Sequence, residues 1–287
     1  MLADDAIANV ILRFAILLGT TLSAGSVLFA MTHRHTAPAV APILRKQILI
    51  GACLVIIAEP VRWFVDQLSM SGGDVSLALD PAMRWIRFEM PQGQAALVRI
   101  LGVVMVTAFW ARWQLLGIVG LTLALGSFAM EGHTAALAKG MPWLSALLFL
   151  HLVAVSWWLA GLWPLVVSLR TASDEEARCA VERFGSIAVG AFGLLTIAGA
   201  VTLVTLTGWT IGLASPYQRI ILAKLFVVAA ILALATYNKF VLTPNLMKSL
   251  PSATQALRAS IRNEILLACI VLLLTGFLST MSPGAEH

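Results

Sequence analysis

Eight apolar runs of membrane-spanning length constrain the fold of this chain more than any other feature. They lie near residues 6–31, 45–68, 94–111, 114–131, 142–169, 184–208, 217–241 and 259–281. An α-helix needs about 20 apolar residues to cross the hydrocarbon core of a bilayer. Backbone polar groups must be paired inside the membrane, which favours helices. The runs predict an all-α polytopic membrane protein, a bundle of about eight transmembrane helices.

The composition excludes a soluble domain with a large core. Hydrophobic residues make up 60% of the chain and charged residues only 11%, whereas a soluble domain has about 25% charged residues. The three cysteines are widely spaced and form no C-x-x-C pair, so no thiolate metal site is expected. Walker and aspartyl-phosphate motifs are missing from the sequence, and we expect a protein that is not an enzyme.

Basic residues are concentrated in alternate loops between the runs. The odd-numbered loops contain Arg34, Arg45, Lys46, Arg112, Arg170, Arg178, Arg183, Lys239, Lys248 and Arg258, and the even-numbered loops contain Arg84, Arg87 and Lys139. Loops rich in lysine and arginine stay on the cytoplasmic side. This asymmetry predicts that both termini lie outside.

Several ionisable residues fall within the apolar runs. They are Glu59, Arg62, Arg99 and Lys224 in the expected outer half, and Glu264 near the inner end of the eighth run. Charges in a membrane usually face the bundle interior and pair with one another. Glu59 and Arg62 are three residues apart and can pair on one helix face. A structural ion pair and a role in translocation both remain open for these residues.

Two histidines and two methionines are the candidate metal ligands. His151 lies about nine residues into the fifth run, roughly 14 Å along a helix, and His133 precedes that run. Met130 is one helical turn before His133, and Met90 lies in an expected outer loop. Thioether sulfur suits Cu(I), and imidazole suits copper generally. A hydrogen-bonded core histidine and core-filling methionines are the structural alternatives.

The second half of the chain carries motifs typical of one known family. They are Gly132-His133-Thr134-Ala135-Ala136, the run from His151 to Leu165, Arg183-Phe184-Gly185-Ser186-Ile187-Ala188, the run from Tyr217 to Leu225, Asn238-Lys239 and Glu264. Together they resemble the copper resistance protein D family (CopD/PcoD-like) of integral membrane proteins. Two departures are Gln218, where the family usually has glycine, and Ala160, where it has the first glycine of a pair.

The resemblance implies a multi-pass protein of the bacterial inner (plasma) membrane that handles copper ions. It also implies a periplasmic copper-binding chaperone as partner and copper passage from periplasm to cytoplasm. Copper would be captured by His133 and outer methionines and passed to His151. Glu59 and Glu264 would then act as polar stations or proton carriers. We expect an N-terminal four-span region at 1–131 and a C-terminal CopD-like region at 132–287, integrated in one bundle.

Two other functions remain open. A membrane haem or quinone oxidoreductase would use both histidines as axial ligands, with Arg13, Arg99 and Lys224 holding propionates or a quinone oxygen. The spacing of the histidines argues against haem, because axial nitrogens approach one iron from opposite faces. A non-transporting structural subunit is the third possibility. Gly190 and Gly193 in the sixth run are expected at a close helix contact.

Overall fold

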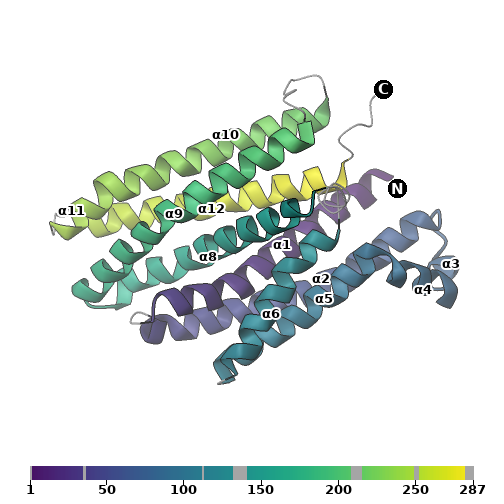
Figure 1. The fold of residues 1–287 in the computed structure, drawn as a ribbon, viewed down its shortest axis with the longest axis horizontal. Helices are drawn as coiled ribbons and strands as arrows, with labels where there is room; N and C mark the ends of the chain where they lie inside the picture. The colour runs from purple at the N-terminus through teal and green to yellow at the C-terminus, as the bar shows by residue number, and fades with distance from the viewer. Residues whose placement is uncertain are drawn as a thin grey trace.

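The computed structural model describes residues 2–34, 37–111, 113–131, 141–207, 215–248 and 252–281. These ranges form helices and contain no strand, which confirms the all-α prediction (Figure 1). The long helices are α1 (Leu2–Thr32), α2 (Ala37–Met70), α5 (Pro91–Thr107), α6 (Gln114–Gly126), α8 (Trp143–Thr171), α9 (Asp174–Thr207), α10 (Pro216–Tyr237) and α12 (Ala253–Thr280). The short ones are α3 (Val75–Ala78), α4 (Pro81–Glu89), η1 (Ala108–Ala111), η2 (Ser127–Met130), the π-helix η3 (Asn238–Leu242) and α11 (Thr243–Met247).

Six helical stretches are long and apolar enough to span a bilayer. They are Ala6–Thr32, Ala39–Met70, Trp143–Thr171, Asp174–Thr205, Pro216–Met247 and Ala253–Thr280. The third and fourth expected spans are shorter. Helix α5 is long enough to span a bilayer only together with α4, and the two are bent by 79°. Gln114–Met130 is apolar but shorter than a membrane-spanning helix. The protein is therefore a multi-pass membrane protein, and the number of eight crossings stays a prediction.

The two ends of the described chain lie at the same end of the bundle. The first turns of α1 and the last turns of α12 are close to this end in Figure 1, and α11 lies at the opposite end. This is what an even number of crossings requires. The placement of both termini outside the cell membrane stays a prediction, as does the division of the chain at residue 131.

Helices α1 and α8 form the centre of the bundle. In the apolar stretch of α8, 72% of the residues are buried inside the protein. In the corresponding stretches that contain α9 and α10, only 11% are buried. Small residues allow the central helices to approach closely, as is usual in membranes. A Cβ atom added to Gly25 of α1 would lie 1.9 Å from the carbonyl oxygen of Ser156 on α8. Gly19 of α1 faces Gly51 of α2 in the same way.

Gly190 and Gly193 of α9 do not lie at a close helix contact. No described atom lies within 4 Å of a Cβ added to Gly190 or Gly193, so the packing expected there is wrong. The physical reason is that α9 packs on α8 with one face and exposes much of the rest, including Val189 and Ile197. Spacing of small residues alone does not show which face of a helix meets a neighbour.

Helix α4 caps one end of α2 and α5. The sequence predicts a short helix here, and α4 is present with Asp80 as its N-cap; the Asp80 carboxylate accepts hydrogen bonds from the amides of Ala82 (2.8 Å) and Met83 (3.3 Å). Arg87 of α4 donates to the Asp66 carboxylate on α2 at 2.5 Å. This end of the bundle is thereby tied together by polar contacts.

Replacing Gly25 by alanine should destabilise the protein. The added Cβ forces α1 away from α8, and overpacking of this kind costs about 1–3 kcal/mol. The thermal midpoint in detergent should fall measurably. The matched control is Gly190→Ala, which has open space around it and gains helix propensity of roughly 1 kcal/mol. Equal midpoints for the two variants would contradict the α1–α8 contact.

Candidate functional site

Four buried charges from three parts of the chain form one ionic cluster. Glu59 comes from α2, Arg99 from α5, and Glu131 directly follows η2; Arg62 lies one turn after Glu59. Arg99 pairs with the Glu59 carboxylate and with Glu131 at 2.6 Å. Arg62 donates to Glu59 at 3.1 Å and to Glu131 at 3.5 Å. Each carboxylate therefore contacts both guanidinium groups, and the charges balance.

Neighbouring groups hold the Arg99 side chain in place. Its Nε donates to the Ser127 hydroxyl at 2.9 Å, and that hydroxyl donates to the Ala124 carbonyl at 2.7 Å. The guanidinium carbon lies 4.0 Å from the centre of the Phe128 ring. Planar guanidinium groups both form bidentate pairs and stack on aromatic rings. As a result, Arg99 binds η2 firmly to α5.

Further charges surround this cluster. Asp66 of α2 lies 4.0 Å from Arg62 and 2.5 Å from Arg87, so it continues the network towards α4. The charge of Arg13 on α1 also acts on Glu131 and Arg62. The sequence predicted the pairing of Glu59 with Arg62, and this ion pair is present. The network reaches more helices than the sequence indicated.

The cluster fits a helix lock better than a binding site for a cation. Glu59 and Arg99 are each only 1% exposed. Both carboxylates already accept hydrogen bonds from arginine. A copper ion would have to displace these donors, and breaking a buried pair costs about 3–5 kcal/mol. The structure thus favours the ion-pair interpretation for Glu59, Arg62 and Arg99.

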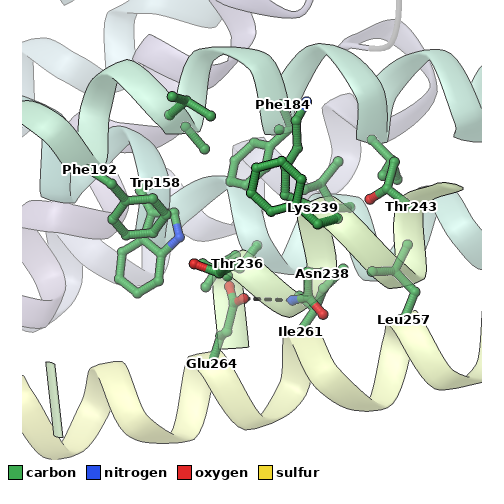
Figure 2. Close-up of a pocket in the computed structure, with 18 of the residues that line it drawn as sticks. Trp158, Phe184, Phe192, Thr236, Asn238, Lys239, Thr243, Leu257, Ile261 and Glu264 are labelled. Atoms are coloured by element: carbon green, nitrogen blue, oxygen red, sulfur yellow. Dashed lines mark hydrogen bonds between the residues drawn. The ribbon is translucent and has the colours of Figure 1, made fainter. Parts of the chain in front are cut away.

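A second polar site lies in a cavity of about 260 Å³ between α8, α9, η3 and α12 (Figure 2). Its walls are mostly apolar, with Glu264 of α12 and Asn238 of η3 among the lining residues. The Asn238 amide donates to Glu264 at 2.6 Å. Both side chains are buried. Glu264, Asn238 and Lys239, which belong to the motifs named above, all line this cavity.

A π-helix brings Asn238 into this cavity. The amide of Thr243 donates to the Asn238 carbonyl, five residues earlier, instead of to the residue four earlier. Pro244 follows directly; it has no amide hydrogen, and its ring crowds the carbonyl four residues before it. The helix widens at this point and resumes as α11. Such π-bulges often occur at functional sites.

The described candidate copper ligands come from different elements of the chain, and His133 lies outside the described residues. His151 is half-buried in α8, where the charge of Lys224 on α10 acts on it. Met130 is exposed at the end of η2, and the Met90 sulfur accepts a weak hydrogen bond from Arg87 at 3.8 Å. Within the described ranges, no three His, Cys, Asp or Glu side chains are grouped to hold a metal ion.

The sequence analysis missed His33. This residue follows α1 and is 1% exposed. Its ring stacks on Phe29, with centroids 4.1 Å apart, and lies near the rings of Trp157 and Phe184. Its Nδ1 lies 3.0 Å from the Thr32 hydroxyl, while Nε2 is buried without a hydrogen-bond partner. In sequence, His33 belongs to a short polar stretch that resembles a solvated loop, so no local signal marks its burial.

Two family models match this chain, one in each half. The N-terminal domain model of copper resistance protein D-like proteins matches residues 1–142, and the copper resistance protein D model matches residues 178–278. The protein is copper resistance protein D-like. Copper resistance protein D of Pseudomonas syringae pv. tomato is 25% identical over 270 residues, which cover 85% of this chain and 84% of that relative. No solved structure matches the chain.

Glu59→Gln in this copper resistance protein D-like protein should lower the folded yield. Arg62 and Arg99 would lose a buried counter-charge, at a cost of about 3–5 kcal/mol. Size-exclusion chromatography and the thermal midpoint measure this loss, and copper bound per folded molecule should not change. Asp66→Asn on the same helix is the control; its side chain is 21% exposed, so we expect a loss of only about 1 kcal/mol. Normal yield with abolished copper binding would instead identify Glu59 as a ligand.

The stability of the protein should depend on pH through His33. Burial, with a smaller contribution from the charge of Arg183, lowers the pKa of His33 to about 4. The unfolded chain takes up this proton near pH 6.5, so the unfolded state binds more protons between these values. Stability is therefore complete above pH 6.5 and falls as the pH drops towards 4, by roughly 3 kcal/mol at most.

The measurement is the thermal midpoint of wild type and of His33→Gln between pH 7.5 and 4.5. Glutamine cannot titrate in this range, so the wild-type advantage should shrink as the pH falls. A difference between the two proteins that stays constant across the range would show that His33 is free to take up a proton in the folded state.

Proposed function

We propose that this protein transports copper across the bacterial inner membrane, from the periplasm to the cytoplasm. The observation that supports this most strongly is that both halves of a multi-pass helical bundle match copper resistance protein D models. Copper is the cargo in this proposal, so the absence of a closed metal centre among the described residues is no obstacle. A transporter must bind its ion weakly enough to release it.

Copper capture takes place at the expected outer end, at His133, Met130 and Met90. Met130 offers an exposed thioether next to the ionic cluster. Met90 is available to copper once Arg87 moves away from its sulfur. Soft sulfur and imidazole ligands suit copper. A periplasmic copper-binding chaperone delivers the ion to this end.

His151 is the next station, within the membrane. Its imidazole is half-buried on α8 and is the ligand type that copper accepts. The positive charge of Lys224 opposes a copper cation at this point. The ion is therefore held only briefly and moves on towards the inner end of the bundle. Glu264 serves there as a proton carrier, because its hydrogen-bond partner is the neutral amide of Asn238.

Copper uptake into proteoliposomes tests the transport function, with metal added on one side only. His151→Ala should abolish uptake while part of the surface binding remains. His133→Ala should raise the copper concentration needed, and excess copper should restore some flux. Leu150→Ala is the control on the same helix, because Leu150 is exposed on the outer surface of the bundle.

Bound copper and the thermal midpoint are measured on the same samples. A lower midpoint for His151→Ala with unchanged copper content would mean that His151 is a structural residue. Wild-type uptake in both histidine variants would overturn the assignment of this pair as copper ligands.

A further inference from the structure

Two buried polar atoms of the Glu264 cavity have no hydrogen-bond partner. They are the indole Nε1 of Trp158, a donor, and the amide Oδ1 of Asn238, an acceptor. Their residues are 5% and 9% exposed, and both line the cavity. Figure 2 shows the indole nitrogen of Trp158 directed towards Glu264, with Asn238 on the other side of Glu264. A buried polar group without a partner is unfavourable, so a ligand that pairs with both atoms binds more tightly.

The shape and walls of the cavity favour an organic ligand. Its volume of about 260 Å³ is many times the roughly 30 Å³ that one water occupies. Aromatic rings of Trp158, Phe184 and Phe192 form part of the wall, and the remainder is largely aliphatic. An ordered water needs two to four polar partners, and most of the cavity wall is apolar. A planar ring with polar substituents fits this pattern.

A copper ion does not fit the same cavity. Its lining contains one carboxylate, one amide, one lysine and two threonine hydroxyls, but no imidazole and no sulfur. Copper prefers nitrogen and sulfur ligands. Lys239, whose Nζ would lie 3.4 Å from a Cβ added to Gly185, places a cationic group at the wall. The cavity therefore has the chemistry of a ligand site for a neutral molecule.

The cavity is accessible from the surface of the membrane-spanning region. Val189 of α9 and Phe240 of η3 line it and are nevertheless 59% and 71% exposed. Helix α9 packs mainly on α8, and α10 mainly on α12, with the cavity between these two pairs. A hydrophobic molecule dissolved in the bilayer can enter by this route.

We propose that this cavity binds a lipid-soluble molecule of the quinone–quinol class. In the quinone form a ring carbonyl accepts a hydrogen bond from Trp158 Nε1. In the quinol form a ring hydroxyl accepts that bond, and the other hydroxyl donates one to Asn238 Oδ1. The ring lies among Phe184, Phe192 and Trp158, and the tail extends past Val189 into the bilayer. This binding is separate from copper transport and does not depend on it.

Titration of a short-chain ubiquinone analogue into the protein in nanodiscs tests the proposal. Binding above the partition into empty nanodiscs should saturate at one molecule per protein. Trp158→Phe keeps the ring but removes the donor, and should weaken binding about tenfold. Ala188→Leu fills the cavity without changing its polar groups and should abolish saturable binding. Leu266→Ala, at an exposed position of α12, is the control and should bind like wild type.

The thermal midpoint of each variant without ligand shows that it is folded; if one of the two cavity variants does not fold, the other decides. Binding of the ubiquinone analogue no greater than its partition into empty nanodiscs would overturn the proposal. So would unchanged saturable binding in the folded cavity variants, because the quinone would then bind elsewhere. The proposal is also overturned if the cavity is found to hold a phospholipid that the quinone does not displace. Copper uptake does not enter any of these outcomes.

Discussion

The bilayer supplies no water to a buried charge, so each charge in this bundle depends on a partner within the protein. Glu59, Arg62, Arg99 and Glu131 meet this requirement as a balanced set of two acids and two bases. Because the set joins α2, α5 and the turn after η2, one electrostatic requirement fixes the relative positions of segments that are far apart in sequence. Asp66 extends the same network to α4 through Arg87, and the charge of Arg13 on α1 acts on it.

The cavity around Glu264 follows a different principle. Its carboxyl group has an amide for a partner, and two further polar atoms nearby have none. In the ionic cluster each carboxylate contacts two guanidinium groups, whereas Glu264 contacts a neutral amide. Balanced charges stabilise the packing of helices, and an unpaired polar atom is available to a ligand. This contrast separates the part of the bundle that holds helices together from the part that can exchange a partner.

Small residues and aromatic rings complete the architecture. Gly25 allows α1 to touch α8, and the contact brings Thr32 within reach of Trp157, whose indole donates to the Thr32 hydroxyl at 2.8 Å. Arg183 of α9 donates to the Thr32 carbonyl at 2.6 Å. His33 is enclosed as a consequence. A copper resistance protein D-like bundle of this kind therefore has buried polar groups in the ionic cluster, at His33 and in the Glu264 cavity.

The sequence by itself determined the all-α membrane class, the approximate helix positions, the copper resistance family and the pairing of Glu59 with Arg62. These properties depend on apolar run length, on motifs and on the i, i+3 geometry of one helix. Only the tertiary structure decided that Arg99 joins Glu59 to Glu131, that Gly25 and not Gly190 lies at a helix contact, and that His33 is buried. The cavity at Trp158 and Asn238 also depends on it. Such features require side chains from different helices, and the rotation of each helix about its axis is set by packing against all of its neighbours.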